Sequence, residues 1–115
     1  MDVKLGRHYF ADLYLCQKCL WEDITQLTAE IAKKLAVTKL SLVVRNSEHP
    51  IIFINFELEA AIILIQMFPE YKFLSLDFFS WNSNLDLTNI SENLIELFAP
   101  QVVAAETRFR AEHLN

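Results

Sequence analysis

The two cysteines are the residues whose spacing first suggests chemistry. Cys16 and Cys19 form a Cys-x-x-Cys motif, which occurs in zinc sites and in thiol redox centres. A structural zinc site needs four ligands, and the sequence has neither a second such motif nor closely spaced histidines. We therefore expect no metal site. We interpret both thiols as ordinary buried cysteines, while their role stays open.

Carboxylates are the other groups that could do chemistry. Glu57 and Glu59 lie two residues apart, so on a strand they would share one face. Acid–base catalysis needs a positioned partner, and the sequence identifies none for these two, for Glu70 or for Asp77. We interpret His8 as a histidine at the start of a strand. An enzyme built on these groups is therefore the weakest functional hypothesis.

Hydrophobic patterns predict the elements that must position these residues. We expect strands at residues 8–15, 38–45, 51–58, 61–68, 73–81 and 101–110, and helices at residues 22–35 and 89–99. Asp23 with Gln26, and Asn89 with Glu92, are expected to cap the two helices. This order predicts an α+β fold, a two-layer α/β sandwich in one domain over residues 1–115. Its antiparallel sheet has about six strands, with both helices on one face.

The second face of that sheet is expected to be covered as well. Residues 51–54 and 61–65 are apolar at consecutive positions, so the strands that contain them are apolar on both faces. The sequence predicts no third helix to cover the second face. We therefore predict that a second subunit covers it.

The composition excludes several classes of protein. The 115 residues are 53% hydrophobic, which excludes disorder, and the longest apolar run, residues 60–65, is too short for a membrane span. A net charge of −5 with scattered Lys and Arg argues against a nucleic-acid partner. With two cysteines, and with Asp2 and Asp12 where a signal peptide would be apolar, we expect a cytoplasmic protein. The single glycine, Gly6, predicts either unusual turns or no tightly enclosed ligand site.

Two segments resemble the bacterial S-adenosylmethionine decarboxylases. Residues 4–8, Lys-Leu-Gly-Arg-His, with Tyr14 and Cys16 are similar to the first strand of that family. Residues 68–71, Phe-Pro-Glu-Tyr, with Asp77 are similar to its Trp-Pro-Glu-Tyr turn and the strand that follows. The order of elements matches over essentially the whole chain. The resemblance implies the family's fold and an enzyme that breaks its own Glu-Ser bond, leaving a pyruvoyl group that serves as an electron sink.

The sequence departs from the family pattern wherever that chemistry lies. With the Pro-Glu turns in register, the Glu-Ser pair, two histidines and a cysteine of the family correspond to Ala60-Ala61, Ile62, Gln66 and Trp81. Alanine has no hydroxyl, and no Ser, Thr or Cys occurs between Ser47 and Ser75 that a shifted register could supply. We therefore expect no self-cleavage, no pyruvoyl group and no other cofactor.

Glu70 is the family's site residue that remains. It matches a glutamate that binds the ribose of the substrate, although it could equally be an ordinary surface glutamate in a turn. The residue that would stack on the adenine corresponds to Ser47.

Two functions are compatible with this pattern. The first is a catalytically inactive partner or regulatory subunit, a homodimer or a heterodimer with an active paralogue, linked to polyamine (spermidine) biosynthesis. The second is a homodimer that binds or senses S-adenosylmethionine or a related nucleoside.

Overall fold

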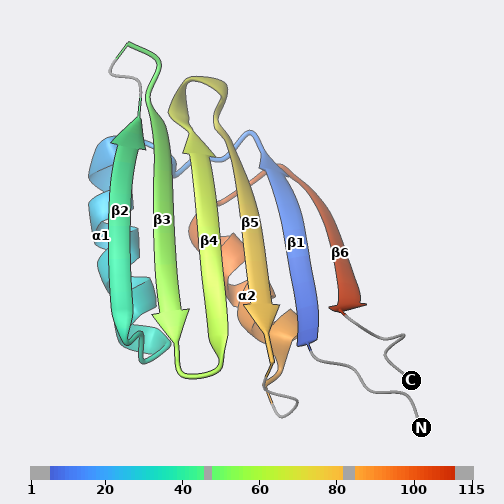
Figure 1. Cartoon of the computed structure of the whole chain (residues 1–115). Helices are drawn as coiled ribbons and strands as arrows, with labels where there is room; N and C mark the ends of the chain where they lie inside the picture. The colour runs from blue at the N-terminus through green and yellow to red at the C-terminus, as the bar shows by residue number, and fades with distance from the viewer. Residues whose placement is uncertain (1–5, 46–47, 82–84, 111–115) are drawn as a thin grey trace, which may run out of the picture.

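The computed structural model describes residues 6–45, 48–81 and 85–110, which form an antiparallel sheet and two α-helices (Figure 1). The strands are β1 (Gly6–Tyr14), β2 (Lys39–Arg45), β3 (Ile51–Leu58), β4 (Ala61–Phe68), β5 (Phe73–Ser80) and β6 (Val102–Arg110). The helices are α1 (Trp21–Lys34) and α2 (Leu87–Leu97), and a 3-10 turn, η1 (Pro69–Tyr71), links β4 to β5.

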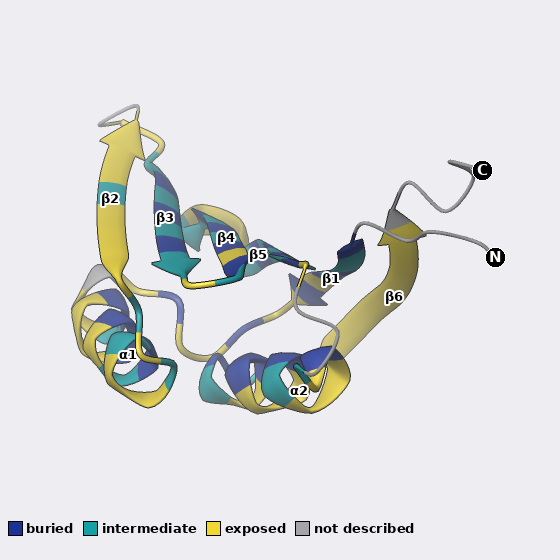
Figure 2. Cartoon of the chain, turned by 60° about the horizontal axis from the view of Figure 1, so that its bottom comes forward, coloured by how far each residue is buried: buried dark blue, intermediate teal, exposed yellow. Residues whose placement is uncertain are grey.

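The strand order in the sheet is β2-β3-β4-β5-β1-β6, and every neighbouring pair is antiparallel. Short connections join β2 through β5 in sequence, whereas β1 lies between β5 and β6 (Figure 1). Both helices lie on one face of the sheet (Figure 2). The predicted fold, with six strands and two helices in two layers, is confirmed for the described residues.

The consecutive apolar residues divide between the two faces of the sheet. On β4, Ala61, Ile63 and Ile65 point toward the helices and are buried, whereas Ile62 and Leu64 point away from them. The side chains that fill the space between sheet and helices form one core, whose largest fully buried members include Leu13, Ile24, Ile31, Phe56, Ile63, Phe78 and Phe98.

The face of the sheet away from the helices is open in this chain, and we call it the open face. Two aromatic groups lie on it. Phe73 lies 5.2 Å from Tyr14 and 5.7 Å from Phe68, measured between ring centroids. The second group consists of His8, Phe10, Phe79 and Trp81, with neighbouring rings 5.1–6.4 Å apart. No helix of the described residues covers this face (Figure 2). Its coverage by a second subunit stays a prediction.

The predicted caps of both helices are wrong by about one turn. The N-cap of α1 is Leu20, and Asp23 occupies the N3 position of the helix. The Asp23 carboxylate accepts a hydrogen bond from the Leu20 N–H, with a donor–acceptor distance of 3.3 Å. The N-cap of α2 is Asp86, whose carboxylate accepts the Asn89 N–H at 3.1 Å. In both cases the acidic side chain reaches an orphan backbone donor at the start of the helix.

Non-glycine residues occupy the left-handed backbone region in four turns. Leu15, Ala36, Lys72 and Ala99 have φ values between 47° and 54°. Glycine normally occupies such positions because it has no Cβ to clash. The unusual turns expected from a chain with one glycine are therefore present. Among the described residues, no helix is long and apolar enough to cross a membrane.

Candidate functional site

The hairpin between β3 and β4 carries Ala60 and Ala61, the residues expected from the sequence to correspond to the family's cleaved bond. Ala60 lies in the turn, and Ala61 begins β4 opposite Ser80 of β5, buried with 1% of its surface exposed. The Ala60 carbonyl oxygen accepts two hydrogen bonds, from the Trp81 N–H at 3.1 Å and from the Ser80 hydroxyl at 3.3 Å. These donors polarise the carbonyl of the 60–61 bond, but the Ala61 methyl group cannot attack it.

Trp81 lies beside this hairpin although it is 20 residues further along the chain than Ala61. Its backbone holds the Ala60 carbonyl, and its ring centroid is 5.9 Å from that of Phe79. Ile62 is the next residue of β4 and pairs with Phe79 across the sheet. The structure therefore brings Ala60, Ala61, Ile62 and Trp81 together at one end of the sheet.

Gln66 lies further along β4, on the open face between Phe53 and Ser75. With a rise of about 3.3 Å per residue, it is roughly 13 Å from Ile62. An amide does not titrate near neutral pH, and none of its neighbours in the register is an acid or a base.

Glu70 lies beyond the far end of β4, in η1. Its carboxylate binds the His49 ring, with Nδ1 2.9 Å from Oε1 and 3.0 Å from Oε2. The two side chains border a hollow of about 310 Å³, together with Pro50, Ile51, Phe68 and Tyr71. Because β4 separates Glu70 from Ala61, the two are roughly 25 Å apart along one chain. Ser47, which is expected from the sequence at the position of the adenine-stacking residue, lies outside the described residues.

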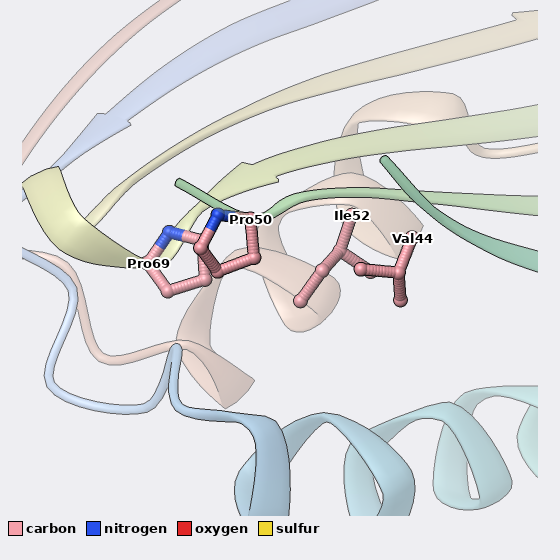
Figure 3. A pocket seen from close by; sticks show the side chains of 4 residues that line it. All are labelled: Val44, Pro50, Ile52 and Pro69. Carbon is pink, nitrogen blue, oxygen red and sulfur yellow. The ribbon is translucent and has the colours of Figure 1, made fainter. Parts of the chain in front are cut away.

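A second hollow, of about 340 Å³, lies on the helix side of the same end of the sheet. Val44, Pro50, Ile52 and Pro69 line it, and Figure 3 shows the two proline rings close together beside Ile52. A third, of about 390 Å³, is lined by Tyr14, Phe68, Tyr71 and Phe73. The hollow between Val44, Pro50, Ile52 and Pro69 has no polar side chain in its lining, so it offers a ligand shape but no orienting hydrogen bond.

The structure gives Asp77 a partner that the sequence did not identify. The His8 Nε2 lies 2.9 Å from the Asp77 Oδ1, on neighbouring strands β1 and β5 of the open face. Phe10 and Phe79 flank the imidazole, and the Arg108 guanidinium lies 5.6 Å above the Phe10 ring. No sequence signal pointed to this pair, because β1 and β5 are far apart in the chain.

The two cysteines are buried and free. Burial, and secondarily the neighbouring Cys19, raises the pKa of the Cys16 thiol to about 11; burial also raises that of Cys19. The Cys19 thiol donates to the Cys16 carbonyl at 3.5 Å. Protonated, buried thiols are poor nucleophiles and poor metal ligands. No cluster of His, Cys, Asp or Glu able to hold a metal occurs among the residues with described positions.

Comparisons with known proteins identify the family and the fold. A model of the S-adenosylmethionine decarboxylase family matches residues 7–111. The chain belongs to the S-adenosylmethionine decarboxylase family. Its fold is similar to the crystal structure of the adenosylmethionine decarboxylase from Aquifex aeolicus VF5, with a TM-score of 0.72 and 22% sequence identity. That match covers 94% of this chain and 92% of the other. No curated protein sequence matches the chain.

Proposed function

We propose that this chain is a member of the S-adenosylmethionine decarboxylase family that does not process itself, forms no pyruvoyl group and catalyses no decarboxylation. It acts in the cytoplasm as a partner or regulatory subunit, linked to polyamine biosynthesis. The observation that carries the proposal is Ala61, a methyl group beside a carbonyl that Ser80 and Trp81 still polarise.

The replacements at the site support this role. A self-cleaving chain needs a nucleophile at position 61 and a proton carrier nearby. Ile62 and Gln66 carry no titratable group, and Trp81 places an indole where the family has a thiol. The hairpin carbonyl has its two donors, from Ser80 and Trp81, but positions 61, 62 and 66 carry no group able to react.

The distance between the two ends of β4 supports a partner. A nucleoside cannot reach from Ala61 to Glu70, roughly 25 Å away along one chain. A site that uses both ends therefore needs a second chain laid across the open face. The apolar side chains of that face, Phe53, Ile62, Leu64, Phe68, Phe73 and Phe79, suit such a contact.

An inactive subunit can change the activity of its partner without reacting. If it binds the competent conformation of the partner more tightly than another conformation, it shifts the population toward the competent one. The size of the change in the partner's conformational equilibrium is limited by that difference in affinity.

Three preparations test the proposal. The wild-type chain should be recovered as one intact 13.4 kDa species. The Ala61→Ser variant should also stay intact, because the new hydroxyl has no neighbouring group to take its proton. Mixing the wild-type chain with the active decarboxylase of the same host should give a mixed complex with altered activity. Cleavage of the wild-type chain, or no effect on the decarboxylase, would contradict the proposal.

Interaction with the decarboxylase should depend on the open face. Leu64→Lys places an ammonium at its centre and should abolish the mixed complex. Gln26→Lys adds the same charge on the exposed surface of α1 and should leave the complex intact. Equal loss of the mixed complex in both variants would show that the open face is not the docking surface.

The second candidate is a homodimer that binds S-adenosylmethionine or a related nucleoside, favoured by Glu70 at the border of a hollow with Phe68 and Tyr71. A carboxylate can accept hydrogen bonds from ribose hydroxyls, and aromatic rings can stack on a base. Millimolar S-adenosylmethionine should then raise the melting temperature of the wild-type chain but not of Glu70→Gln. An unchanged melting temperature in the wild-type chain would exclude this candidate.

A further inference from the structure

The last strand of the sheet is exposed on both faces and along its outer edge. Every described side chain of β6, residues 102–109, is exposed (Figure 2). The strand lies at the end of the sheet, and no described strand pairs with its outer side. The helix α2 packs against β1 and β5 and leaves β6 uncovered.

The strand β6 lacks two of the features that usually prevent edge strands from pairing, a bulge and a proline. Its pairing with β1 runs without a bulge from Gly6 opposite Arg110 to Tyr14 opposite Val102, and it has no proline. Val102, Val103 and Phe109 leave 51%, 42% and 46% of their surfaces exposed. A long and regular edge strand is a template for another strand.

We propose that β6 pairs with β6 of a second copy of this chain. The two strands run antiparallel about a twofold axis at Thr107 and join two sheets into one. This surface is distinct from the open face, so the inference goes beyond the proposed function and does not depend on it.

Charge complementarity favours this register. With Thr107 opposite Thr107 of the second copy, Glu106 lies opposite Arg108 of the second copy, and the reciprocal pair forms on the other side of the axis. In one chain these two side chains share a face, lie 3.0 Å apart, and are 52% and 62% exposed. The twofold axis therefore joins two such pairs into a group of four alternating charges, and opposite charges across strands are stabilising.

The other features of the register agree with it. The small Ala105 lies opposite the large Phe109 of the second copy, which leaves room for the ring on the helix side. Shifting the axis to Glu106 or to Arg108 places a charge directly opposite the same charge, which is unfavourable.

The opposite edge of the sheet does not offer the same contact. Strand β2 has seven residues and carries Lys39 and Arg45 at its ends. If β2 paired with itself about Leu42, Lys39 would lie opposite Arg45 twice. Cations placed opposite each other in this way disfavour the pairing.

The assembly that results keeps the open faces available. A twofold axis perpendicular to the sheet leaves the helices of both copies on one side. The two open faces then lie next to each other on the other side, where each can take a partner.

Charge exchange tests the register in sedimentation equilibrium. Glu106→Arg and Arg108→Glu each place like charges across the axis, and each should raise the dimer Kd by roughly tenfold or more. Mixing the two variants should restore dimers, because the two arginines of the first variant then face the two glutamates of the second. Each variant has lost its own pair within the strand, so recovery in the mixture reports only the contact between chains.

A cross-link gives an independent readout. Thr107→Cys should form a disulfide-linked dimer under mild oxidation, since the two introduced thiols face each other at the axis. Ser41→Cys, at a position that is also exposed, on β2, should not form such a dimer. The inference is overturned if the wild-type chain is monomeric, if the single charge variants dimerise as well as the wild type, or if the mixture fails to recover dimers.

Discussion

Two neighbouring isoleucines of β4 should respond differently to truncation, because they point to opposite faces of the sheet. Ile63 is buried in the core with none of its surface exposed, whereas Ile62 on the open face keeps 38% exposed. Ile63→Ala leaves a cavity and should lower the free energy of unfolding by about 2–5 kcal/mol. Ile62→Ala should lower it by about 1 kcal/mol, since much of that side chain remains in water.

The order of the two effects should be reversed for the binding of a partner to the open face. Fully burying an isoleucine contributes about 1.5–3 kcal/mol, so a partner that covers the exposed 38% of Ile62 adds roughly 0.6–1.1 kcal/mol. Ile62→Ala should therefore weaken binding through the open face by a factor of about three to six. Ile63→Ala should leave the affinity of the folded protein nearly unchanged.

Chemical denaturation measures the first effect, and titration with the partner subunit measures the second. Equal losses of stability in the two variants would show that the open face is packed within the chain. A normal affinity for Ile62→Ala would show that this part of the face binds no partner.

Three further predictions concern stability. Lys72→Gly should raise the free energy of unfolding by roughly 1 kcal/mol in thermal melts, because Lys72 has a φ of 51°; an unchanged or lower stability would contradict this reasoning. Asp86→Ala should lower the free energy of unfolding by about 1 kcal/mol through loss of the α2 cap, whereas Asp86→Asn should retain most of the stability. The raised pKa of Cys16 means that the folded state holds the thiol proton more tightly than the unfolded state. Its contribution to stability is therefore present below the usual pKa of 9.0 and is lost as the pH rises through about 11. Cys16→Ala should accordingly lose less stability relative to the wild type at pH 11 than at pH 8.

The strands and helices could be predicted from the sequence because their signals are local. The alternation that separates Ile62 from Ile63, and the helical spacing of Ile24, Leu27 and Ile31, depend on neighbours a few residues away. The caps were misplaced for the same reason. Asp23 is a strong cap residue by type, but the backbone enters the helix at Leu20, which has no such signal.

The pairs that form the site could not be predicted, because they depend on strand order. Asp77 meets His8 because β1 inserts beside β5, and the chain gives no local sign of that insertion. Similarly, the contact between Ala60 and Trp81 follows from the register of β4 on β5. The resemblance to the decarboxylase family predicts that Ala60, Ala61 and Trp81 belong to one site, and the sheet explains why these three positions lie together.

Native mass spectrometry of the protein from its own host shows at once whether the chain is cleaved and what it binds. We expect an uncleaved 13.4 kDa chain in a mixed complex with a pyruvoyl-bearing decarboxylase. Two fragments in place of the intact chain would contradict the absence of self-processing. An intact chain that binds only copies of itself, while the decarboxylase is present in the same extract, would contradict the partner role.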